Sequence, residues 1–193
     1  MQRCCVNFVK VASYPLPMKH LFLKYSWLPA LLLFSACMKE PAYPDEPSIS
    51  FNSITQQKKQ DALGNPVIEL KIAVNFKDGD GNLGLSEEDT LAPFNDTPGN
   101  KFNNNYFVKA FVAPKGQSAF QPYEPFIPYD GRFLRLSPDD GSRTLEGELR
   151  YTINILPGFD FQSGDRIKFN IQIADRSLHL SNTIETEPIT LEF

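Results

Sequence analysis

The sequence has few of the residues that most often carry covalent and metal chemistry. Its 193 residues include only three cysteines, two histidines and one tryptophan. All three cysteines lie at or before residue 37, which excludes disulfides, thiolate catalysis and cysteine zinc sites from residues 38–193. The same stretch keeps a single histidine, His179, so a zinc site built from several histidines is excluded as well.

Positive charge is concentrated near the N-terminus. Residues 1–36 contain four basic residues and no acidic residue. Removing these four from the 19 Lys and Arg of the chain leaves 15 basic residues against 23 Asp and Glu, a formal charge of −8. A surface this acidic repels phosphate backbones, so we expect no nucleic-acid partner.

The N-terminal segment has the layout of a secretory signal. From Met18 it shows a basic start, an apolar stretch too short to span a bilayer, and small residues just before Cys37. The stretch "LLLFSAC" resembles a bacterial lipobox, which implies that Cys37 is lipidated and begins the mature chain. The alternative is an ordinary signal followed by a stray cysteine. We expect translation to start at Met18, so that residues 1–17 are an extension absent from the protein. We expect a signal peptide over 18–36 and, after it, the lipidated Cys37 and a proline-rich tether over 37–47.

Beyond the tether, apolar residues alternate with polar ones. The clearest example is "VIELKIAVNF" from Val67, in which Ile72 and Val74 fall on the apolar face and Lys71 on the other. Similar patterns predict further strands near residues 48, 106, 132, 144, 165 and 186. About seven antiparallel strands separated by turns predict an all-β domain over 48–193, most simply an immunoglobulin-like β-sandwich.

Three stretches carry a family resemblance. The "SAC" lipobox, "FKDGDGNLGL" and "IQIADRSLHLSNTIETEPITL" together resemble small lipoproteins of Bacteroidota with one immunoglobulin-like domain. The acidic residues soon after Cys37 are similar to the export signals of surface lipoproteins in that phylum. Because those relatives lack an assigned activity, the resemblance implies only a fold and a location. We expect an outer-membrane lipoprotein on the cell surface.

One glycine-rich loop has the spacing of a calcium site. In "DGDGNLGLSEED" five oxygen-bearing side chains occupy positions 1, 3, 5, 9 and 12, and a backbone carbonyl could add a sixth ligand. The candidate ligands are Asp78, Asp80, Asn82, Gly84, Ser86 and Asp89. Leu83, however, occupies the sixth position, where such loops need glycine, and repeated Asp-Gly is also typical of turns. A turn is therefore the favoured interpretation, and Ca²⁺ binding is its alternative.

An aromatic and proline-rich segment is the candidate ligand surface. Phe120, Tyr123, Phe126 and Tyr129 lie between prolines in a stretch without a clear strand pattern. Exposed rings of this kind could stack on sugars or peptides. The favoured interpretation is that they close one end of the core while the prolines protect a sheet edge. The long connection over 77–105 is a second candidate for a functional loop.

The sequence favours a non-catalytic role. Asp175, His179 and Ser181 lie within seven residues, but one short turn cannot easily aim all three at one reacting atom. We therefore expect no enzyme, but a lipid-anchored binding or accessory protein of the cell envelope. Its partner would be an envelope protein or a glycan, and the lipid would provide its only membrane contact. The alternative is an envelope hydrolase that cleaves glycans through a carboxylate pair.

Overall fold

The structure is a computed structural model that describes residues 42–136, 143–158 and 160–193. The expected extension, the signal peptide and Cys37 lie outside the described residues. Within the described ranges the regular structure consists of strands and one short 3₁₀ helix, Lys101–Asn103. No helix in these ranges is both long and apolar enough to cross a membrane.

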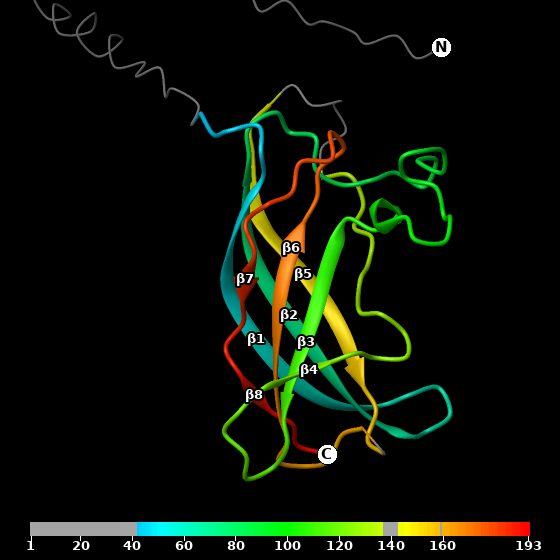
Figure 1. Cartoon of the computed structure of the whole chain (residues 1–193), viewed down its shortest axis with the longest axis vertical. Coiled ribbons are helices and arrows are strands. Elements are labelled where there is room, and N and C mark those ends of the chain that lie inside the picture. The colour runs from blue at the N-terminus through cyan, green and yellow to red at the C-terminus, as the bar shows by residue number, and fades with distance from the viewer. Residues whose placement is uncertain (1–41, 137–142, 159) are drawn as a thin grey trace, which may run out of the picture. The chain divides into compact units, whose positions relative to one another are not determined.

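The strands form two antiparallel sheets, which lie one in front of the other in Figure 1. The first sheet has the order β1–β2–β5, with β1 at Ser48–Gln60, β2 at Pro66–Asp78 and β5 at Leu145–Ile155. The second has the order β4–β3–β6–β7, with β8 also paired to β6. Its strands are β4 at Gln121–Tyr123, β3 at Tyr106–Ala113, β6 at Arg166–Ile173, β7 at Ile184–Glu185 and β8 at Ile189–Thr190. The predicted all-β, antiparallel architecture is confirmed, and it is consistent with a β-sandwich.

The pattern of β2 explains how the two sheets share one core. β2 is paired with both β1 and β5, so it is the central strand of its sheet. Successive side chains of a strand point to opposite faces of the sheet. Ile72 and Val74 are fully buried, whereas Lys71 between Leu70 and Ile72 is exposed. Phe169 and other inward side chains of the second sheet belong to the same apolar cluster. The predicted inward face of β2 is therefore confirmed.

A register shift in β1 accounts for the imperfect alternation of its sequence. The pairing of β1 with β2 skips one residue between Phe51 and Ser53. Such a bulge adds one residue to a strand and changes which side chains face inward. Ile49 is consequently buried before the bulge, while Ile54 after it is only partly buried.

Two predicted strands differ from the structure. The stretch from Arg132 to Leu136 forms one isolated bridge, between Leu134 and Leu85, rather than a strand. The reason is that the Asn105 side chain donates to the Phe133 carbonyl and accepts from the Phe133 N–H, at 3.0 and 2.8 Å. These bonds replace pairing with a neighbouring strand. Of the strand expected from residue 186, only β8 at Ile189–Thr190 forms, while β7 at Ile184–Glu185 precedes it. Pro188, which lacks an N–H group, lies between the two short strands.

Candidate functional site

The inward faces of two central strands each end in an aspartate. In β2 the alternation of buried residues continues from Phe76 to Asp78, and in β6 it continues from Ile173 to Asp175. Asp78 is 0% exposed and Asp175 only 2% exposed. The two strands belong to opposite sheets and finish at the same end of the core, so these carboxylates meet there.

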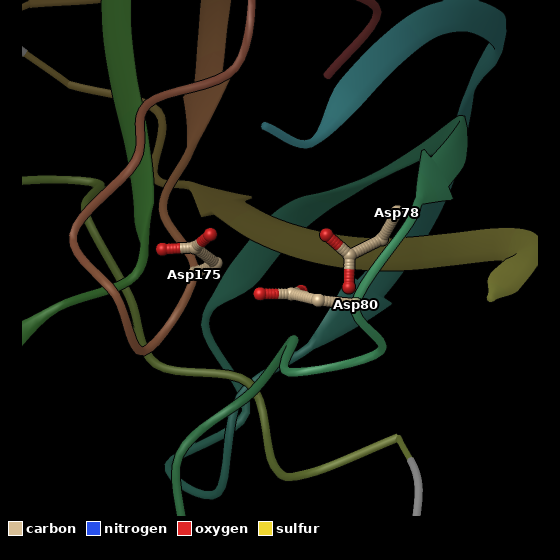
Figure 2. Close-up of side chains that lie close together, drawn as sticks. All are labelled: Asp78, Asp80 and Asp175. Carbon is tan, nitrogen blue, oxygen red and sulfur yellow. The ribbon is translucent and has the colours of Figure 1, made fainter. Parts of the chain in front are cut away.

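Asp80 adds a third carboxylate to this acidic cluster, which consists of Asp78, Asp80 and Asp175. One oxygen from each residue can be chosen so that all lie within 4.8 Å of one another. Figure 2 shows Asp78, the last residue of β2, and Asp80, on the turn that follows, facing Asp175 on the segment after β6. The turn depends on glycine, because Gly81 has a φ of +70° and a Cβ there would overlap the backbone oxygen of Arg143.

The members of the cluster differ in their hydrogen bonds. Asp80 accepts from the side-chain amide of Asn82 at 2.6 Å. Asp175 accepts from the backbone N–H of His179 at 2.7 Å and contacts the His179 Nδ1 at 2.9 Å. Among the described residues, neither carboxylate oxygen of Asp78 has a hydrogen-bond partner, and the same holds for Oδ1 of the buried Asn82.

Burial and like charge disfavour ionisation at the centre of the cluster. Burial, followed by the charges of Asp80 and Asp175, raises the pKa of Asp78 to about 6. The N–H groups of Asn82 and Gly81 act in the opposite direction, although neither makes a hydrogen bond of normal geometry to Asp78. Burial also raises the pKa of Asp80. Chemically, such a cluster can take up a proton or hold a cation.

The structure divides the six residues of the predicted calcium loop. Asp78, Asp80 and Asn82 lie together, but Asp89 accepts from the Ser86 N–H at 2.7 Å and forms an ion pair with Arg135 at 3.2 Å. Gly84 has a φ of +90° and packs against the backbone of Leu134. Gly84 therefore has a role in the turn, and it is not part of the acidic cluster.

Asp175 was not among the predicted ligands, although the sequence contains a signal for it. It follows Ile167, Phe169, Ile171 and Ile173 at a spacing of two, so it takes the next inward position. The sequence instead placed it beside His179 and Ser181. In the structure the Ser181 hydroxyl accepts from the Ile173 N–H at 3.0 Å and donates to the Asn182 carbonyl at 2.8 Å. That hydroxyl is thus engaged by the turn backbone.

A groove of about 650 Å³ lies on the outer face of β3, and we call it the β3 groove. Two of the four predicted aromatic residues, Tyr123 and Tyr129, line it. Both also contact the core, because Tyr123 lies edge-on to Phe161 at 4.9 Å and Tyr129 edge-on to Phe169 at 6.1 Å between ring centroids. Tyr123 and Tyr129 therefore form part of the groove wall and also cover the core.

The other two predicted aromatic residues lie elsewhere. Phe126 is fully exposed beside the exposed Ile127, at the tip of the segment that follows β4. Phe120 is half-buried between two cations, with Arg166 at 5.1 Å and Lys168 at 4.9 Å from its ring centroid. Neither residue lines the β3 groove.

The β3 groove combines aromatic and basic side chains. Phe107 and Phe111 alternate with the exposed Lys109 along the outer face of β3. Lys101, from the 3₁₀ helix, also lines the groove and lies 5.9 Å from the Phe107 ring centroid. Two carboxylates, Glu124 and Asp130, line the same groove, so its basic and acidic side chains are equal in number.

Comparison of the chain with protein-family models, curated proteins and solved structures gives no significant match.

Proposed function

We propose that this protein is a non-catalytic, glycan-binding domain held at the cell envelope by a lipid on Cys37. The observation that carries the binding role is the β3 groove, in which aromatic rings, two lysines and two carboxylates line one cavity. The lipobox-like stretch "LLLFSAC" and the resemblance to surface lipoproteins of Bacteroidota support the location.

The strand order supports an immunoglobulin-like fold as part of this proposal. The orders β1–β2–β5 and β4–β3–β6–β7 correspond to the A–B–E and C′–C–F–G arrangement of immunoglobulin-like sandwiches. In that correspondence the β3 groove lies on the outer face of the C′–C–F–G sheet. A rigid sheet that presents a ligand site on its outer face suits a binding domain rather than one that moves during a reaction.

The chemistry of the groove favours an acidic glycan. The faces of Phe107 and Phe111 offer flat apolar surfaces for sugar rings. Lys101 and Lys109 lie beside these rings, where they would attract carboxylate or sulfate groups. The groove carboxylates, Glu124 and Asp130, equal the lysines in number, so the preference for an acidic glycan rests on these local contacts and not on the overall charge of the groove. The groove is also lined by three prolines, Pro122, Pro125 and Pro128. Proline has no backbone N–H, so this wall is a poor partner for another β-strand.

Calorimetry with defined oligosaccharides tests this function. The full chain in a non-ionic detergent is titrated with uronic-acid and sulfated oligosaccharides, and with neutral ones of equal length. We expect selective binding of the acidic set, weakened about tenfold by Phe107→Ala because one stacking contact is lost. Lys109→Ala should weaken binding and reduce its dependence on salt. Lys71→Ala, on the exposed face of the other sheet, is the control and should change nothing. Equal affinity for neutral sugars, or no binding at all, would contradict the proposal.

The hydrolase alternative has one observation in its favour. Two carboxylates, Glu124 and Asp130, line the same groove, and Asp130 is oriented by a 2.8 Å hydrogen bond from the Val108 N–H. Paired carboxylates cleave glycosidic bonds in most glycosidases. Incubation with the same oligosaccharides should release no new reducing ends. Release that disappears in Glu124→Gln would establish the hydrolase instead.

A further inference from the structure

We propose that Asp78, Asp80 and Asp175 bind one calcium ion that joins the two sheets at the end of the core. This site is separate from the β3 groove and does not depend on glycan binding. Its ligand set also differs from the twelve-residue loop suggested by the sequence, because Asp175 comes from the second sheet and Asp89 does not take part.

The clearest evidence is a contrast between buried aspartates. Asp165 is also buried, and its two carboxylate oxygens accept the N–H groups of Lys115 and Gln162, each at 2.8 Å. Asp175 is satisfied by His179. Asp78 is the most deeply buried of the three, yet neither of its oxygens has a partner among the described residues. Buried carboxylates normally have partners, so the unpaired oxygens of Asp78 indicate a ligand that protein groups do not supply.

The unpaired oxygens are directed at the other carboxylates. Figure 2 shows the Asp78 carboxylate turned toward Asp80 and Asp175 rather than away from them. Asn82, whose side chain donates to Asp80, holds a second buried oxygen without a partner among the described residues. A neutral amide oxygen beside three carboxylates is a common element of calcium sites. Asp78 and Asn82, which flank Asp80 on the same turn, therefore both hold buried oxygen atoms without a partner among the described residues.

The spacing of the cluster fits calcium. Calcium binds oxygen at about 2.3–2.6 Å, so two ligands on opposite sides of the ion lie about 4.6–5.2 Å apart. The three carboxylates offer oxygens no more than 4.8 Å from one another, which is the scale of the ligand shell of one ion. Magnesium requires about 2.0–2.1 Å together with strict octahedral geometry. Calcium accepts irregular geometry, so it suits carboxylates from separate segments better than magnesium does.

Charge supports a divalent cation over a proton. One shared proton would neutralise a single carboxylate and leave two buried negative charges in contact. A calcium ion offsets two charges and supplies a direct partner to each carboxylate. The His179 ring lies at the periphery of the cluster, with its Nδ1 atom 2.9 Å from the Asp175 carboxylate.

The position of the site assigns it a structural role. Asp78 and Asp80 flank the end of β2 in one sheet, while Asp175 follows β6 in the other. The backbones of these segments are already joined by an isolated bridge between Leu83 and Asp175. Calcium would hold the same two segments through their side chains and fix the separation of the sheets at this end.

A calcium titration tests the site directly. The full chain in detergent is treated with a chelator, and its melting temperature is followed by circular dichroism during addition of calcium chloride. At a hundredfold excess over the Kd, we expect a rise of about 5–10 °C and a stoichiometry of one by calorimetry. Asp78→Asn should abolish both responses. Without calcium it should melt no lower than wild type, because the amide removes a buried charge while keeping the side-chain shape.

Matched variants separate this site from its competitors. Asp80→Asn, at a less buried position, should also abolish the calcium response and serves if Asp78→Asn fails to fold. Asp89→Asn should lower the starting melting temperature but keep the full response, since Asp89 pairs with Arg135. Loss of the response in Asp89→Asn would assign the ion to the twelve-residue loop instead. An equal rise with magnesium, an equal rise with potassium chloride at the same ionic strength, or no response in wild type would each overturn the proposal.

Discussion

Two stacked tyrosines of the core differ in a single hydrogen bond. The rings of Tyr106 and Tyr151 are nearly parallel, with centroids 4.4 Å apart. The Tyr151 hydroxyl donates to the Tyr129 carbonyl at 3.0 Å, but the Tyr106 hydroxyl is buried without a partner among the described residues. Burial raises the pKa of Tyr106 far above its usual value, so this hydroxyl remains protonated. Folding therefore removes the hydrogen bond between this hydroxyl and water, and no protein group among the described residues replaces it.

The pair gives opposite expectations for the same substitution. Tyr106→Phe should leave the free energy of unfolding unchanged or raise it by about 1–3 kcal/mol, because it removes an unpaired buried hydroxyl. Tyr151→Phe should lower that free energy by about 0.5–1.5 kcal/mol, because it deletes a formed hydrogen bond. Chemical denaturation of both variants measures the difference. Equal losses would mean that the Tyr106 hydroxyl has a partner in solution.

At the scale of the element, the burial pattern of β2 was predictable because β2 is paired on both edges, with β1 and with β5. Each side chain has a fixed face once a strand is paired, so period-two alternation in the sequence specifies burial directly. The same logic failed for the stretch from Arg132. There the backbone bonds to the side chain of Asn105, 28 residues away from Phe133, and no local pattern encodes that contact.

The register of β2 can be tested with two adjacent residues. Ile72→Ala should lower the free energy of unfolding by about 2–5 kcal/mol, because it leaves a cavity in the core. Lys71→Ala should cost under about 0.5 kcal/mol, because its side chain is half-exposed and its 3.3 Å ion pair with Glu69 is screened by water. Urea denaturation compares the two. Similar losses would indicate that β2 is paired one residue out of register.

The long connection between β2 and β3 is held by arginines rather than by strand pairing. Arg132 donates to the carbonyl oxygens of Ser86 and Asp89 at 3.1 and 2.6 Å, and Arg135 pairs with the Asp89 carboxylate. Burial alone would raise the pKa of Asp89, but the Ser86 N–H and Arg135 outweigh it and hold the pKa below its ordinary value of 3.8. Asp89 is thus more readily ionised in the folded protein than in the unfolded chain.

This pKa shift predicts how pH affects the connection. A carboxylate with a lowered folded pKa contributes stability above its unfolded pKa, and this contribution is lost as pH falls through the folded value. Asp89→Asn should therefore be less stable than wild type at pH 7, and the difference should shrink as pH falls below about 4. Denaturation of both chains in chelator at pH 7, 5 and 3 gives the comparison. A constant difference across this range would show that Asp89 acts through packing instead of charge.

At the scale of the whole molecule, the acidic cluster shows what one sequence can and cannot specify. Asp78 and Asp80 were identified from their spacing, but Asp175 lies nearly a hundred residues later in the chain. Their meeting depends on which strands end at the same end of the core, and that is a property of the topology. The place of Lys101 in the β3 groove was equally hidden, since it belongs to a short 3₁₀ helix that no pattern predicted.

Anchoring is also a property of the whole chain, and its test does not depend on how the domain folds. Cys37→Ala should yield an unprocessed or soluble protein, because lost acyl chains remove about 0.8 kcal/mol of membrane affinity per buried CH₂. Membrane fractionation and the intact mass of the protein measure this effect. Unchanged mass and equal membrane retention would rule out lipidation at Cys37. Recovery of any peptide from residues 1–17 would contradict the expected start at Met18.

The start of the described chain is attached to the same turn that carries the acidic cluster. Gly79, between Asp78 and Asp80, donates its N–H to the Pro44 carbonyl at 2.9 Å, and a Cβ at Gly79 would overlap the backbone there. Tyr43 adds a 2.6 Å hydrogen bond to Glu146 on β5. A pull applied through the N-terminal segment would therefore meet Glu146 on β5, through Tyr43, and then Gly79, through Pro44, before it reaches the first paired residues of β1. We expect the start of β5 and the turn after β2, rather than β1 itself, to resist such a pull first.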